Sequence, residues 1–216
     1  MIEAVVFDMD GVIVDSEPVW QQARVDLIRE HGRVWTERDG DDTRGRASEV
    51  WANRISERLD SALTPEEVFA EILQRMVARY EERLPLFAGA VDAIQRVADA
   101  YTVAVASGSP DVLIDLVLSK SGLDQVTAAV GYGDEMPRGK PAPDVYLDVL
   151  NRLDVDPSRS VGVEDSESGL LSVQAAGMHS IAVVSPEYRL SGDVLGPTAL
   201  QIERLEELTV PMIAAI

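Results

Sequence analysis

The stretch Phe7-Asp8-Met9-Asp10-Gly11 decides the fold, because it places two carboxylates directly after a predicted strand. The preceding run, Ala4-Val5-Val6-Phe7, is apolar and lacks a helical period, which predicts a strand buried on both faces. Open α/β sheets bind their ligands at the carboxyl ends of strands. Taken alone, D-x-D-G is more often a plain turn, since Asp and Gly are common where strands end. The rest of the chain decides between these two interpretations.

Beyond Pro85, strand patterns alternate with helical patterns. Strands are predicted at 101–106, 126–130, 160–163 and 180–184, and helices at 89–100, 110–121, 143–153 and 168–176. This alternation predicts right-handed crossovers and an α/β, Rossmann-like, mostly parallel sheet with helices on both sides. Leu200–Ile202 is expected to add an edge strand, and 210–216 a short helix.

Residues 16–84 carry helical patterns with almost no strand signal. Helices are predicted to begin at Glu17, to span 48–59, and to span 64–84, where Thr64-Pro65-Glu66-Glu67 forms a capping signal. We therefore expect a core domain from residues 1–15 and 85–216, interrupted by an all-helical cap domain, 16–84. An insertion just after an acidic strand end is expected to act as a lid.

The composition excludes several classes of function. The 216 residues carry a formal net charge of -19, which argues against nucleic acid or an anionic membrane as a partner, because both are bound through Lys and Arg clusters. The absence of Cys excludes disulfides and thiol catalysis. We expect a cytoplasmic protein without a leader or membrane span, as a monomer or weak homodimer.

Polar side chains follow three further strands. Ser107-Gly108-Ser109 precedes a helix, where it forms either an anion site or a simple helix cap. Lys140 lies between a glycine and a proline in a tight turn, which argues for a fixed point charge, although most surface lysines are only solvated. Glu164 and Asp165 end the strand 160–163 as a second carboxylate pair, although Asp165 or Ser166 could instead cap the next helix.

If these strand ends converge, four carboxylates share one crevice: Asp8, Asp10, Glu164 and Asp165. Neighbouring carboxylates raise one another's pKa unless a cation compensates them. Mg2+ suits this site, because it takes oxygen ligands, keeps several waters and accompanies phosphate substrates.

Four motifs in this order resemble those of the haloacid dehalogenase-like hydrolase superfamily. They are D-M-D-G at 8–11, A-S-G-S at 106–109, G-K-P-A-P-D at 139–144 and V-E-D-S-E-S-G at 163–169. Each motif is weak alone, but four in the right order and spacing are specific. The resemblance covers the whole predicted core and implies a helical cap between the first and second motifs.

The resemblance implies a role for each motif residue. Asp8 would be the nucleophile that takes the phosphoryl group as an aspartyl-phosphate, and Asp10 would protonate the leaving alcohol and then activate water. Ser107 and Lys140 would hold phosphoryl oxygens, with Gly108 and Ser109 beside them. Mg2+ would be bound by Asp8, the backbone carbonyl of Asp10, and Asp165, with Glu164 as a direct ligand or a neighbour of the ligands.

Within the superfamily, the sequence favours a phosphatase acting on a small sugar or sugar-alcohol phosphate monoester. Asp15–Trp20 resembles the 2-deoxyglucose-6-phosphatase and hexitol phosphatase branch. The β-phosphoglucomutase-like mutases, which are the alternative, carry His where this chain has Trp20, although Trp20 could equally be ordinary core. Gly45 and Arg46 loosely match a substrate-contacting cap stretch, or form a solvated loop. A non-catalytic binding protein is less favoured, because every motif carboxylate and the motif lysine are present.

Overall fold

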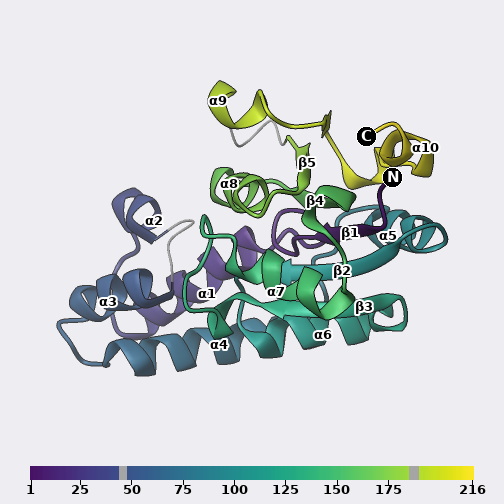
Figure 1. The fold of residues 1–216 in the computed structure, drawn as a ribbon. Coiled ribbons are helices and arrows are strands. Elements are labelled where there is room, and N and C mark those ends of the chain that lie inside the picture. Colours follow the sequence, from purple (N-terminus) through teal and green to yellow (C-terminus); the bar gives the residue numbers. More distant parts are fainter. Residues whose placement is uncertain (44–47, 185–189) are drawn as a thin grey trace. The chain divides into compact units, whose positions relative to one another are not determined.

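A six-stranded parallel sheet forms the centre of the structure, which is a computed structural model describing residues 1–43, 48–184 and 190–216 (Figure 1). The strand order is β3 (Thr127–Tyr132), β2 (Thr102–Ser107), β1 (Ala4–Phe7), β4 (Ser160–Glu164), β5 (His179–Val183) and β6 (Leu200–Ile202). All five pairings are parallel, which confirms the predicted α/β class and the edge strand at 200–202. The order reverses at β1, where ligand sites of open α/β sheets form.

Helices connect the strands and bury the sheet. They are α5 (Ala90–Ala98), α6 (Asp111–Ser121), α7 (Asp144–Leu153), α8 (Glu167–Ala175), α9 (Gly192–Leu195) and α10 (Val210–Ala214), with short 3-10 turns at Leu123–Gln125, Gly133–Glu135, Pro157–Arg159 and Leu205–Glu207. One core cluster packs α7 and α8 on the sheet through Val6, Ala104, Ala106, Val145, Tyr146, Val149, Leu150 and Val173. The alternate residues Phe7 and Val105 are also buried, so both faces of the sheet are covered.

Two units make up the described chain: a sheet unit (Met1–Asp15 and Leu84–Ile216) and a helical unit (Ser16–Arg83). The helical unit contains α1 (Glu17–Glu30), α2 (Glu37–Thr43), α3 (Ser48–Arg58) and α4 (Pro65–Glu82). The capping signal is confirmed, because the Thr64 hydroxyl accepts from the Glu67 backbone while the Glu67 carboxylate accepts from the Thr64 backbone. Helix α4 ends at Glu82, two residues earlier than predicted, because a residue directly before a proline, here Leu84, is disfavoured in helical geometry.

The two chain segments that bound the helical unit are hydrogen-bonded to each other within the sheet unit. The Asp15 backbone N–H donates to the Pro85 carbonyl at 2.8 Å, and the Phe87 N–H donates to the Ile13 carbonyl at 3.0 Å. Val14 and Leu86 form an antiparallel bridge between them.

Through the described ranges, every helix is too short or too polar to span a bilayer.

Candidate active site

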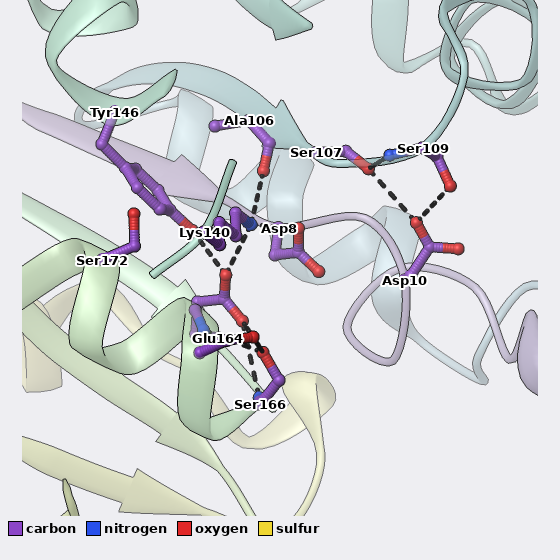
Figure 2. A network of polar contacts seen from close by, with 12 residues as sticks. Asp8, Asp10, Ala106, Ser107, Ser109, Lys140, Tyr146, Glu164, Ser166 and Ser172 are labelled. Carbon is purple, nitrogen blue, oxygen red and sulfur yellow. Dashed lines mark hydrogen bonds and ion pairs between the residues drawn. The ribbon is translucent and has the colours of Figure 1, made fainter. Parts of the chain in front are cut away.

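Three adjacent strands bring the sequence motifs to one edge of the sheet. Phe7 at the end of β1 pairs with Val105 of β2 and Val163 of β4, so the residues that follow lie side by side. The Asp8 backbone N–H continues the pairing by donating to the Val163 carbonyl at 2.9 Å. Figure 2 shows Asp8, Lys140 and Glu164 grouped together, with Asp10, Ser107 and Ser109 beside them.

Lys140 is the cation of this group. Its Nζ lies 2.7 Å from Asp8 Oδ1 and 2.6 Å from Glu164 Oε1, and it donates to the Ala106 carbonyl at 3.1 Å (Figure 2). These three acceptors match the three protons of an ammonium group. The Lys140, Asp8 and Glu164 side chains are 13%, 8% and 0% exposed, so the ion pairs are largely shielded from water.

Glu164 has contacts that sequence reasoning missed. The Tyr146 hydroxyl donates to Oε1 at 2.8 Å, and the Ser166 hydroxyl donates to Oε2 at 3.2 Å. A Cβ on Gly169 would overlap the Glu164 carboxylate, so only glycine leaves room there. Both oxygens of this buried carboxylate therefore have partners inside the protein. Ser166 also caps α8, as the sequence suggested, by accepting from the Gly169 N–H at 3.0 Å.

Asp10 is held by two hydroxyl groups of the second motif. Its Oδ2 accepts from Ser107 Oγ at 3.2 Å and from Ser109 Oγ at 2.7 Å (Figure 2). Ser107 Oγ also accepts from the Ser109 backbone N–H at 3.0 Å, so this buried hydroxyl is fully engaged. Asp10 Oδ1 is buried and has no hydrogen-bond partner among the described residues. Gly108, between the serines, is exposed.

The acidic groups form a site that fits a divalent cation. Asp8, Glu164 and Asp165 each offer a carboxylate oxygen within 4.8 Å of the others. Gly11 admits Asp165: it has φ +76°, and a Cβ there would overlap the Asp165 carboxylate. Asp10 adds a fourth carboxylate whose charge acts on Asp8. The possible ligands are all oxygen, which is the chemistry that Mg2+ prefers.

The pKa shifts reflect this excess of negative charge. Burial, followed by the charge of Glu164, raises the pKa of Asp8 well above its usual range, although Lys140 opposes the shift. The same two causes raise the pKa of Asp165 to about 7. Burial opposes the charged form of Lys140, but the carboxylates of Asp8 and Glu164 outweigh it and raise its pKa. The ammonium therefore stays charged, and no second cation contacts these carboxylates within residues 1–43, 48–184 and 190–216.

The predicted cap residues lie apart from these motifs in the sequence, and their roles stay predictions. Trp20 belongs to α1 and is buried in the helical unit, where its ring centre lies 6.0 Å from that of Trp51. The Arg24 guanidinium lies over both rings, at 5.6 and 5.3 Å. Gly45 and Arg46 lie outside the described residues.

Comparisons with known proteins agree with this arrangement. The sequence model of the haloacid dehalogenase-like hydrolase family matches residues 2–177 of this chain. Hexitol phosphatase B of Escherichia coli K12 is 33% identical over 189 residues, covering 86% of this chain and 85% of that protein. The phosphorylated carbohydrates phosphatase of Thermotoga maritima is 28% identical over 208 residues, 96% of each chain. The fold also matches β-phosphoglucomutase from Clostridium difficile, with a TM-score of 0.79, 21% identity, and 100% and 96% coverage.

Proposed function

The chain belongs to the haloacid dehalogenase-like hydrolase family, as an enzyme of the phosphatase type, and we propose that it hydrolyses a small sugar or sugar-alcohol phosphate monoester through an aspartyl-phosphate on Asp8. The observation that carries the proposal is the contact of Lys140 with the Asp8 carboxylate at 2.7 Å, beside Asp10 and Asp165. A carboxylate with a fixed ammonium suits attack on an anionic phosphoryl group, because the positive charge offsets the repulsion between the two anions.

The site would hold Mg2+ through Asp8, Asp165 and the backbone carbonyl of Asp10. Glu164 belongs to the same acidic group, but its two oxygens already bind Lys140, Tyr146 and Ser166. We therefore propose that Glu164 lies next to the metal ligands and does not itself bind the ion. Bound there, the ion would neutralise charge on the phosphoryl oxygens.

In the first step, an Asp8 oxygen bonds to phosphorus and the bond from phosphorus to the leaving oxygen breaks. Asp10 gives its proton to that oxygen, which departs as an alcohol. Lys140 binds a phosphoryl oxygen during the transfer, and the Ser107 hydroxyl, whose single proton goes to Asp10 in this structure, would turn it to a phosphoryl oxygen when substrate binds. Ser109 continues to fix one Asp10 oxygen, and Oδ1, which has no hydrogen-bond partner among the described residues, is available to carry the proton.

In the second step, Asp10 takes a proton from water, and the water oxygen attacks phosphorus. The bond to Asp8 breaks, which releases inorganic phosphate and regenerates the carboxylate. Uncatalysed monoester hydrolysis is so slow that enzymes supply up to ~10^21-fold acceleration. General acid catalysis gives only about 10^2- to 10^4-fold, so positioning and charge must supply most of it.

The substrate class rests on the relatives and on the first helix. Two relatives are named as phosphatases of hexitols and phosphorylated carbohydrates. Trp20 stands where mutases of the β-phosphoglucomutase type carry His, and its indole cannot take up a proton near neutral pH. We therefore expect no control of Asp10 by a histidine at this position, which favours water as the acceptor of the phosphoryl group.

The test is a panel of hexose, pentose and hexitol phosphates with Mg2+, scored by released phosphate. A parallel reaction contains β-glucose 1-phosphate and a trace of the 1,6-bisphosphate, scored by isomerisation. We expect phosphate release with negligible isomerisation, and no release by Asp8→Asn. Rapid isomerisation with little free phosphate would show a mutase, and no turnover of any compound would favour a binding protein.

A further inference from the structure

We infer that the Tyr146 hydroxyl is a positioning group for Lys140. Glu164 and Asp8 both attract the Lys140 ammonium, and the hydroxyl weakens the attraction of Glu164 by donating a hydrogen bond to it. The ammonium therefore stays on Asp8. The inference rests on the proposed function, in which Asp8 and Lys140 act on the phosphoryl group. Tyr146 itself touches neither Asp8 nor the edge where substrate would bind: its described hydrogen bonds are with Glu164 and Lys140.

Tyr146 approaches the cluster from α7. The side chain is 0% exposed and belongs to the buried stripe that packs this helix on the sheet. Its ring centre lies 5.0 Å from Lys140 Nζ, and Figure 2 shows its hydroxyl directed at Lys140 and Glu164. The packing therefore fixes the hydroxyl, and a Phe at this position would keep the ring and lose only the oxygen.

The direction of the hydrogen bonds follows from counting protons. Lys140 Nζ has three, and the acceptors Glu164 Oε1, Asp8 Oδ1 and the Ala106 carbonyl lie at 2.6, 2.7 and 3.1 Å. The Tyr146 oxygen is the most distant neighbour, at 3.3 Å. The Tyr146 proton is therefore free for Glu164 Oε1, at 2.8 Å.

Glu164 and Asp8 compete for a single ammonium. Glu164 is the more buried of the two and has the shorter contact with Nζ. A second donor on Oε1 satisfies part of its hydrogen-bonding capacity, which reduces its pull on Lys140. Without the hydroxyl, a fully buried carboxylate loses a partner, and the Lys140 ammonium, which already contacts Oε1 at 2.6 Å, is the group beside it that can compensate. The ammonium should then shift toward Glu164 and away from Asp8.

The test compares Tyr146→Phe with Tyr132→Phe. The control removes a similar bond, since the Tyr132 hydroxyl donates to Asp115 at 2.7 Å, but in an exposed place without contact to Lys140. Removing a charge-stabilising donor costs about 10^2- to 10^3-fold in kcat, so a displaced one should cost about 10- to 100-fold. We expect that loss in kcat for Tyr146→Phe with KM within about threefold, and wild-type kinetics for the control.

Two further readouts separate positioning from general damage. In a Glu164→Gln background, Tyr146→Phe should change kcat less than about twofold, because the competing charge is gone. In crystals of Tyr146→Phe, the distance from Lys140 Nζ to Asp8 Oδ1 should exceed about 3.5 Å, beyond hydrogen-bond range.

An undisplaced Lys140, or an equal loss of kcat in both backgrounds, would overturn the inference. If the wild-type enzyme released phosphate from no compound, the proposed function would fail instead. The crystallographic distance would still decide the role of Tyr146, because it requires no turnover.

Discussion

Replacing Lys140 with Met should destabilise the sheet unit and make its stability strongly dependent on pH. Met keeps the unbranched chain, shorter by the terminal nitrogen, and removes the charge that contacts Asp8 and Glu164 at 2.7 and 2.6 Å. Both carboxylates are less than a tenth exposed, so water cannot replace the ammonium. Removing one partner of a buried ion pair costs about 3–5 kcal/mol, and we expect that loss for the metal-free protein at pH 8.

The loss should shrink in acid. Burial already raises the pKa of Asp8 above its unfolded value, and Lys140 opposes that rise, so Lys140→Met raises the pKa further. A folded state that holds a proton more tightly than the unfolded state gains stability as the pH falls toward the unfolded pKa. Each pH unit over which the folded variant holds a proton that the folded wild type does not hold is worth about 1.4 kcal/mol. The loss at pH 5.5 should therefore be smaller than the loss at pH 8.

The assay is urea unfolding in chelator at both pH values. Far-UV circular dichroism follows the whole chain, whereas fluorescence follows the helical unit, because all three tryptophans, Trp20, Trp35 and Trp51, lie there. Lys120→Met is the matched control: it removes the chain's other lysine from an exposed position at the end of α6 and should cost less than about 0.5 kcal/mol. A loss below about 1 kcal/mol, or one equal at both pH values, would refute the reasoning.

Four shorter predictions address the nucleophile, metal binding, its pH dependence, and the stability of the metal-free protein. Asp8→Asn should lower phosphate release by about 10^4-fold or more while circular dichroism and unfolding stay close to wild type, and appreciable turnover would remove Asp8 as nucleophile. Gly11→Ala should weaken Mg2+ binding in calorimetry by about tenfold or more, because the added Cβ would overlap the Asp165 carboxylate. Gly122→Ala is the control: it places alanine at a similar positive φ of +75°, but with open space around the Cβ, and should bind Mg2+ normally. The pKa of about 7 at Asp165 implies that protons compete with Mg2+ below neutrality. The apparent Kd for Mg2+ should therefore rise about tenfold per pH unit from pH 6 downward and level off above pH 8. An affinity that does not change between pH 5 and pH 8 would contradict this. The same shift should make the metal-free protein lose stability as the pH rises from 4 to 7, because the folded state holds the proton there.

Local patterns predicted the sheet well, because its four central strands are short, mainly buried runs bounded by turn residues. The apolar run at 4–7 and the alternation after Pro85 were sufficient for class and connectivity. The carboxylates at strand ends could also be found, since parallel strands end at one edge. The identity of the neighbour that each carboxylate contacts was not visible, because such partners lie far apart in the sequence, as do Asp8 and Lys140, which are 132 residues apart, and depend on strand order.

Tyr146 shows the limit most clearly. Its position fits the apolar stripe of α7, with Val145, Val149 and Leu150, so periodicity assigns it to the core. That assignment is correct for the ring and incomplete for the hydroxyl. The available signal was a tyrosine in an otherwise aliphatic stripe six residues after Lys140, because a buried tyrosine oxygen usually requires a partner.

The paired segments around residues 13–15 and 85–87 make the helical unit a replaceable module. Its two ends leave the sheet unit from segments that are hydrogen-bonded to each other. For the folding of the sheet unit, the insert is therefore equivalent to a loop whose ends are already held together. Doubling the length of such a loop costs about 0.6 kcal/mol in closure entropy. Insertion, deletion or exchange of whole helices at this point therefore leaves the strands and their carboxylates nearly untouched. We therefore expect that a helical unit grafted from a relative at this joint would leave the sheet unit and its carboxylates folded as they are here.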